Sequence, residues 1–181
     1  MADRSVTVFC SSSDRLDREY YETAEIVGQA LAHHHIALVF GGGAVGLMGT
    51  LARAVHATNG HVTGVIPHAL KKVEGIAYSA SDELVITDTM RERKGVMYDR
   101  ADAFLVMPGG YGTLEEFLEV VTLKQLGYHN RRIVLLNTGG YFDSLISFFA
   151  EMDESGFVRK QSEPLFDVIS DPGDVIDALF P

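Results

Sequence analysis

The stretch AFLVMPGGYGTLEE, residues 103–116, predicts a buried strand that runs through a glycine turn into a helix. Its first five residues are uncharged and apolar, which is typical of a strand covered on both faces of a parallel sheet. Free N–H groups and the positive dipole end of a helix start attract anions, and glycine lets the backbone approach them closely. The turn from Gly109 to Thr113 is therefore expected to bind a phosphate group.

Glu116 gives this turn two competing interpretations. A carboxylate one helical turn from a bound phosphate is unfavourable for simple binding, so it indicates work on the ligand. Thr113-x-x-Glu116 is also a capping box, in which the two side chains satisfy N–H groups at a helix start. The local sequence favours neither interpretation over the other.

Short apolar segments alternate with longer helical patterns along the rest of the chain. Strands are expected at residues 5–10, 37–40, 62–66, 84–87, 103–107 and 133–136. Helices are expected at residues 20–33, 47–57, 89–100, 113–126 and 141–154. This alternation predicts an α/β fold, a three-layer α/β/α Rossmann-like domain with a mainly parallel sheet. Ligands in such folds bind beyond the carboxyl ends of the strands.

Size and composition set broad limits. A chain of 181 residues, 46% hydrophobic, suits a single nucleotide-binding α/β domain over residues 1–181. A formal net charge of -10 argues against nucleic-acid binding. Cys10 is the only cysteine and is expected to be a buried, inert thiol in a reducing compartment. No apolar run is long enough for a membrane span and no signal peptide is apparent, so we expect a soluble, cytoplasmic protein.

A second glycine cluster, Gly41-x-Gly43-x-x-Gly46, follows the strand expected to end at residue 40. It matches the dinucleotide fingerprint, but that site needs an acidic residue at the end of the next strand. Residues 66–68 are Ile-Pro-His instead. We therefore expect close packing around a mononucleotide, with Gly42 and Gly43 as phosphate-loop candidates beside Gly109. A tight strand-to-helix turn without a ligand is the alternative.

Two other groups of charged or metal-binding residues need an interpretation. MRERK, residues 90–94, starts the helix expected after the strand at 84–87, so it should emerge at the same sheet edge as both glycine turns. An arginine there can bind phosphate or ribose through two hydrogen bonds, although a charged helix start is commonly just solvated.

His33, His34 and His35 are consecutive and point about 100° apart on a helix. We therefore expect no metal site.

Together, GGGAVGLMG (41–49), MRERK (90–94) and PGGYGTLEE (108–116) resemble the LOG (Lonely Guy) family. Its members are cytokinin riboside 5′-monophosphate phosphoribohydrolases, sometimes mislabelled lysine decarboxylases. The resemblance covers most of the chain. It implies hydrolysis of the N-glycosidic bond of a nucleoside 5′-monophosphate to free base and ribose 5-phosphate, without a cofactor.

The resemblance also implies site residues and an assembly. Arg93 and Glu116 match the catalytic pair. The positions that match substrate-binding residues are Glu74, Arg93, Lys94, Gly110, Tyr111, Gly112, Thr113, Leu114, Glu115, Glu116 and Thr122. The implied assembly is a homodimer built on the helix at 113–126, with Thr122 close to a neighbouring site.

Other functions remain open at this point. A noncatalytic nucleotide carrier on the same fold would use the same loops, and only Arg93 and Glu116 speak against it. A nicotinamide oxidoreductase is disfavoured by the missing acid near residue 66. A pyridoxal-dependent decarboxylase is disfavoured because no lysine has the sequence context of a Schiff-base residue. The sequence does not indicate which base is released.

Overall fold

The computed structural model describes residues 4–71, 76–158 and 163–181. The strands are β1 (Arg4–Phe9), β2 (Ile36–Phe40), β3 (Val62–Pro67), β4 (Glu83–Thr87), β5 (Ala103–Val106), β6 (Arg132–Leu136) and β7 (Asp167–Ile169). The helices are α1 (Arg18–His33), α2 (Gly46–Ala57), α3 (His68–Lys71), α4 (Met90–Asp99), α5 (Tyr111–Gln125), η1 (Thr138–Gly140), α6 (Asp143–Glu154), η2 (Pro172–Asp174) and α7 (Val175–Leu179).

One sheet of seven strands forms the centre of the molecule. Its order is β4-β3-β2-β1-β5-β6-β7, and every neighbouring pair is parallel. The chain moves outward from β1 to β4 and then returns to place β5 on the other side of β1. The strand order therefore reverses between β1 and β5, where α/β folds have a crevice for ligands.

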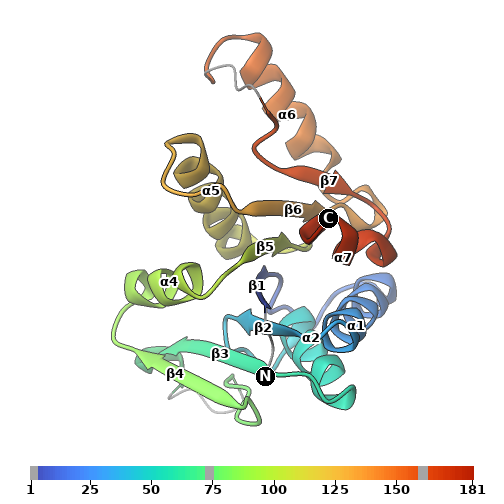
Figure 1. The fold of residues 1–181 in the computed structure, drawn as a ribbon, viewed down its shortest axis with the longest axis vertical. Helices are drawn as coiled ribbons and strands as arrows, with labels where there is room; N and C mark the ends of the chain where they lie inside the picture. The colour runs from blue at the N-terminus through green and yellow to red at the C-terminus, as the bar shows by residue number, and fades with distance from the viewer. Residues whose placement is uncertain (1–3, 72–75, 159–162) are drawn as a thin grey trace.

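Helices cover both faces of the sheet, so the expected three-layer α/β/α fold is confirmed. Figure 1 shows α4 and α5 on one side and α1, α2 and α7 on the other. Alternate residues of the central strands enter two separate cores. In β5, Leu105 faces the core shared with α1 and α2, whereas Phe104 and Val106 face the core beneath α4 and α5. This alternation follows from the two-residue period of a strand.

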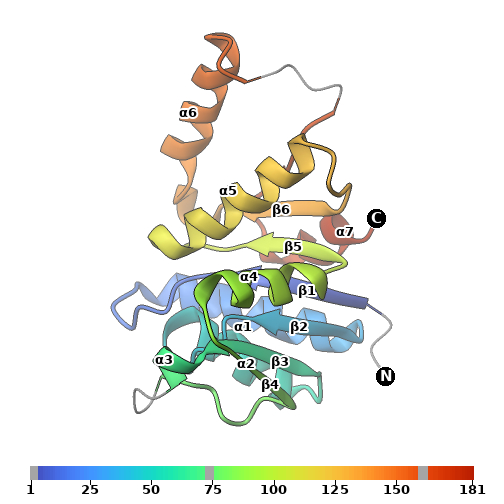
Figure 2. The same ribbon diagram turned by 90° about the vertical axis from the view of Figure 1, so that its left-hand side faces the viewer.

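The helix α1 illustrates how sequence spacing decides packing. Ala24, Val27 and Leu31 are fully buried and share one face, because residues three and four apart lie together on a helix. By contrast, α6 has no buried residue and projects from the body of the molecule (Figure 2). It is the least covered of the long helices.

Candidate active site

The loops that leave β1, β2 and β5 meet at the carboxyl edge of the sheet. The N–H of Ser11 donates to the carbonyl of Pro108 (3.1 Å), and the N–H of Met48 donates to the carbonyl of Ser11 (3.2 Å). Gly46 adopts a left-handed φ of 61°, and a Cβ on it would lie 2.5 Å from the carbonyl oxygen of Ser13. These contacts bring the two glycine turns together at the carboxyl edge of the sheet, as the sequence predicts, and the structure shows that the strand order reverses there.

The turn after β5 presents unpaired backbone N–H groups. Gly110 is the N-cap of α5, and no side chain caps the helix. Among the described residues, the first N–H of this segment with an acceptor is that of Leu114, which donates to the carbonyl of Gly110 (3.1 Å). The N–H groups from Gly110 to Thr113 are consequently available to an anion at the positive end of the α5 dipole.

The capping-box interpretation of Thr113 and Glu116 is wrong. The helix begins at Tyr111, two residues earlier than expected, so Thr113 lies inside its first turn. Gly109 packs against Thr113, whose Oγ1 would lie 2.1 Å from a Cβ at position 109. Glu116 turns away from the helix start and bonds a residue on α4.

Arg93 and Glu116 form a buried ion pair between α4 and α5. Arg93 Nη1 lies 2.6 Å from Glu116 Oε1, and the two side chains are only 6% and 8% exposed. The Nε of Arg93 also donates to the carbonyl of Val65 at the end of β3 (3.1 Å). Buried charges require such partners because desolvation is costly. No hydrogen bond to Glu116 Oε2 occurs among the described residues, so this oxygen is available to a ligand.

The second glycine turn provides space for the guanidinium. A Cβ on Gly41 would lie 2.1 Å from Arg93 Nη2. Gly42 is buried at a φ of 72° against Val65 and Ile66. Gly43 forms an isolated antiparallel bridge with Ala77. The glycine turn therefore leaves room for the Arg93 side chain. The role of this turn as a phosphate loop stays a prediction.

Burial raises the pKa of Glu116, and the positive charge and hydrogen bond of Arg93 lower it. Burial also raises the pKa of the Cys10 thiol far above its usual range, and the negative charge of Glu116 adds to that effect. Cys10 is therefore buried and protonated at neutral pH, as expected, and it is not a nucleophile.

Lys94 forms a second, more exposed link between the same helices. Its ammonium group pairs with the carboxylate of Glu115 and with that of Glu119, the latter at 3.1 Å. Hydrogen bonding to Glu115 is the main cause that raises the pKa of Lys94. The amine therefore stays charged, which suits an anion contact and does not suit a Schiff-base nucleophile.

The other predicted site residues lie at different distances from the ion pair of Arg93 and Glu116. Tyr111 is 95% exposed at the start of α5, while Leu114 is half-buried within its first turns. Thr122 lies six residues beyond Glu116 on α5, about 9 Å along the axis, and lines a hollow of about 570 Å³ between α5 and α6. It does not meet the ion pair within one chain. Glu74 lies outside the described residues.

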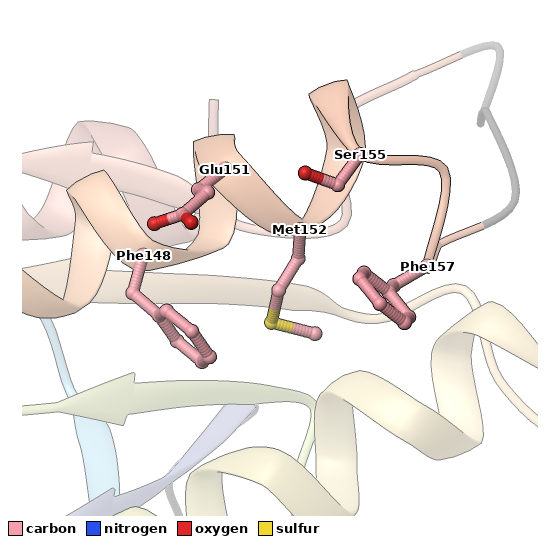
Figure 3. Close-up of a pocket in the computed structure, with 5 residues that line it drawn as sticks. All are labelled: Phe148, Glu151, Met152, Ser155 and Phe157. Atoms are coloured by element: carbon pink, nitrogen blue, oxygen red, sulfur yellow. The ribbon is translucent and has the colours of Figure 1, made fainter.

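A smaller hollow of about 340 Å³ lies on α6 (Figure 3). Phe148, Met152 and Phe157 extend to the same side there, and the two phenylalanines are 55% and 84% exposed. Neither hollow contains Arg93 or Glu116. We therefore identify the candidate active site from the buried ion pair and the free N–H groups.

Tyr141 is a residue of this region that was not among the predicted site residues. Its hydroxyl donates to the carbonyl of Gly109 (2.7 Å). Tyr141, in the turn that follows η1, therefore contacts the predicted phosphate turn. The only signal was its place after Gly139 and Gly140, which does not predict a contact 32 residues away in the sequence.

The part of the chain that the structure describes has neither a metal-binding cluster nor a membrane-spanning helix. Within ranges 4–71, 76–158 and 163–181, no three His, Cys, Asp or Glu side chains gather in a way that could bind a metal ion. His33 ends α1, while His34 is its C-cap. No helix in these ranges has the length and apolar character that crossing a bilayer requires.

Known proteins share sequence with most of this chain. A family described as possible lysine decarboxylase matches residues 48–179. The cytokinin riboside 5′-monophosphate phosphoribohydrolase LOG2 of Arabidopsis thaliana is 41% identical over 169 residues, which cover 93% of this chain and 78% of that protein. The probable phosphoribohydrolase LOGL2 of Oryza sativa subsp. japonica is also 41% identical, over 97% of this chain and 72% of that protein.

Solved structures share the fold at much lower identity. The molybdenum cofactor carrier protein of Chlamydomonas reinhardtii matches with a TM-score of 0.73 and 21% identity over 97% of this chain and 94% of its own. The molybdenum cofactor binding protein of Rippkaea orientalis has a TM-score of 0.69 and 20% identity over 96% and 93% of the two chains. These likenesses concern the fold alone.

Proposed function

Because this chain belongs to the LOG family of cytokinin riboside 5′-monophosphate phosphoribohydrolases, we propose that it hydrolyses the N-glycosidic bond of a nucleoside 5′-monophosphate. The products are the free base and ribose 5-phosphate. The observation that carries the proposal is the buried pair of Arg93 and Glu116, which is one helical turn from the free N–H groups of α5.

Glu116 is the residue that acts at the bond being broken. The reaction has a transition state with oxocarbenium character, in which positive charge develops on the ribose. A carboxylate near C1′ stabilises that charge and can orient the attacking water. Burial makes its field strong because little water screens it, and Arg93 opposes the rise in pKa that burial causes, which favours the charged form.

Arg93 and the N–H groups position the substrate. A guanidinium does not stabilise a developing cation, so Arg93 acts on phosphate or ribose oxygens and fixes the sugar relative to Glu116. The N–H groups from Gly110 to Thr113 bind the 5′-phosphate with the α5 dipole. This division of roles accounts for a carboxylate beside a phosphate site. Because binding energy comes heavily from the phosphate, free nucleosides should react poorly.

A substrate panel tests this proposal. AMP, its N6-isopentenyl derivative and the corresponding nucleosides are incubated with the protein, and base and ribose 5-phosphate are measured by chromatography. We expect release from the monophosphates and a rate at least about 100-fold lower from the nucleosides. Binding of the monophosphates without release of base would favour the carrier alternative. Comparable rates on AMP and adenosine would contradict the role of the phosphate turn.

The family description as a possible lysine decarboxylase predicts a different chemistry, which the site does not favour. Pyridoxal chemistry requires a lysine that can become a neutral nucleophile. Lys94, the lysine beside the ion pair, has a raised pKa because Glu115 and Glu119 bind its ammonium group.

We also propose that the protein is a homodimer in which α5 of one chain approaches the site of the other. Thr122 matches a nucleotide-contacting position of the family, yet on α5 it lines a separate, largely apolar hollow. Leu118 and Phe148 add exposed apolar surface to the same region. Burial of this surface against a second copy would bring Thr122 to a neighbouring site.

We further propose a reducing, cytoplasmic environment for this protein, with which its single, buried cysteine, Cys10, agrees.

A further inference from the structure

Tyr141 connects the end of β6 to the predicted phosphate turn. Its hydroxyl donates a hydrogen bond to the carbonyl oxygen of Gly109 at 2.7 Å. The residue is 47% exposed and makes this contact from the turn between η1 and α6. The bond therefore joins two loops at the carboxyl edge of the sheet.

The backbone that carries Tyr141 is itself fixed. Gly139 and Gly140 adopt left-handed φ values of 60° and 72°, a conformation that favours glycine and lets the chain reverse tightly. The Asn137 side chain then accepts from the N–H of Phe142 (2.7 Å) and donates to Asp143 (2.7 Å). These bonds secure the residues that follow Tyr141.

The aromatic ring is held by two edge contacts. The ring of Phe142 lies 4.9 Å away at 82°, and that of Tyr20 lies 6.1 Å away at 78°. Both are favourable geometries for aromatic pairs. These contacts and the hydrogen bond orient the hydroxyl toward Gly109.

The carbonyl of Gly109 belongs to the same peptide unit as the N–H of Gly110. A trans peptide is planar, and its C=O and N–H point in opposite directions. No cis peptide bond occurs among the described residues. Fixing the Gly109 carbonyl therefore fixes the direction of the Gly110 N–H. A peptide between two glycines turns more easily than others, because neither neighbour has a Cβ to restrict it.

We propose that Tyr141 is a positioning residue, which holds the Gly109–Gly110 peptide so that the Gly110 N–H points at the 5′-phosphate. The inference rests on the proposed function for the identity of the anion. Tyr141 does not need to touch the substrate. Its effect is a preorganised turn that binds phosphate without first having to order a flexible peptide.

The test removes the hydroxyl and keeps the ring. Tyr141→Phe is compared with wild type and with Tyr128→Phe, a matched control because Tyr128 is 73% exposed on the segment after α5 and its hydroxyl makes no hydrogen bond within the described part of the chain. Calorimetry measures the Kd of ribose 5-phosphate, and steady-state assays measure KM and kcat for AMP. Thermal unfolding measures the stability of each variant.

For Tyr141→Phe we expect the Kd of ribose 5-phosphate and the KM of AMP to rise about three- to tenfold, the effect of one hydrogen bond. We expect kcat to change less than about twofold, because the variant leaves Arg93 and Glu116 intact. An unchanged Kd would overturn the inference, as would a fall in Tm with no loss of affinity. Absence of base release from AMP by the wild type would refute the proposed function, whereas an active wild type with an unchanged Kd and KM in Tyr141→Phe would refute only the role of Tyr141, so the two failures are distinguishable.

Discussion

At the scale of single residues, Glu116 has an environment that structure alone could reveal. The sequence places a glutamate three residues after a threonine, which is compatible with a capping box or with catalysis. The fold excludes the capping box, because α5 starts at Tyr111 and Glu116 faces Arg93, and the catalytic role stays a prediction. Arg93 and Glu116 lie 23 residues apart in sequence. The resemblance and the sheet-edge argument placed both residues at one site, but neither their ion pair nor the contact of Arg93 with Gly41 could be derived from spacing.

Replacement of Glu116 by glutamine tests its role at C1′. We expect Glu116→Gln to bind AMP but to release base at least about 100-fold more slowly, because it removes the charge that stabilises the transition state. Glu25→Gln is the matched control, since Glu25 is an exposed carboxylate on α1. Near-normal turnover by Glu116→Gln, measured by chromatography of released base, would refute the assignment.

The raised pKa of Glu116 predicts the acid side of the pH profile. Only the ionised carboxylate stabilises the cation, so kcat/KM, which reports the pKa values of the ligand-free protein, should fall as the pH drops through a pKa above the usual 4.5 of a glutamate. The pH dependence of ribose 5-phosphate binding, measured in parallel, separates the titration of the phosphate itself. A kcat/KM that stays constant down to pH 4.5, after correction for the titration of the phosphate, would be inconsistent with the predicted shift.

At the scale of elements, the alternation of strands and helices was predictable because buried parallel strands and amphipathic helices have different hydrophobic periods. All six predicted strands are confirmed within two residues of their ends. β7 and the single turn of α3 were not predicted. β7 has only three residues, and its strand conformation depends on pairing with β6, so local sequence carries little signal for it.

Packing between the β2–α2 turn and α4 leads to a test of Arg93. Gly41→Ala would place a Cβ 2.1 Å from Arg93 Nη2. Because the guanidinium is buried and bonded to Glu116 and Val65, we expect its displacement to lower the free energy of unfolding by about 1–3 kcal/mol. The displaced guanidinium should lower kcat/KM about 10- to 100-fold.

Gly95→Ala provides the matched control for this substitution. Gly95 lies inside α4, and a Cβ there meets nothing within 4 Å. Alanine should therefore stabilise the helix by about 0.5–1 kcal/mol and leave turnover unchanged. Equal kinetics for Gly41→Ala and wild type would show that Arg93 does not depend on the glycine turn.

At the scale of the whole molecule, the order of the strands explains why distant motifs share one site. β1 lies between β2 and β5, so the loops after all three reach the same edge. The sequence predicted this edge but not the strand order, which depends on long-range pairing. Thr122 shows the same limit, because its place in the hollow between α5 and α6, away from the ion pair, depends on tertiary packing.

The dimer is tested by its mass and by its activity. Light scattering should give twice the 19.8 kDa of one chain. Glu116→Gln and Thr122→Arg chains with different tags are co-expressed, and the mixed dimer is purified. If Thr122 serves the neighbouring site, this dimer has one intact site and about half of the wild-type activity. A mixed dimer as inactive as both parents, or a monomer at micromolar concentration, would exclude the arrangement.

The most direct test of the central claim follows both halves of the broken bond. Wild-type protein is incubated with AMP in ¹⁸O-labelled water, and the products are separated and weighed by mass spectrometry. Hydrolysis at C1′ predicts equimolar adenine and ribose 5-phosphate, with one ¹⁸O atom in each sugar and none in adenine. The claim would be contradicted if no base were released from AMP or from its N6-isopentenyl derivative. It would also be contradicted if base were released without labelled ribose 5-phosphate.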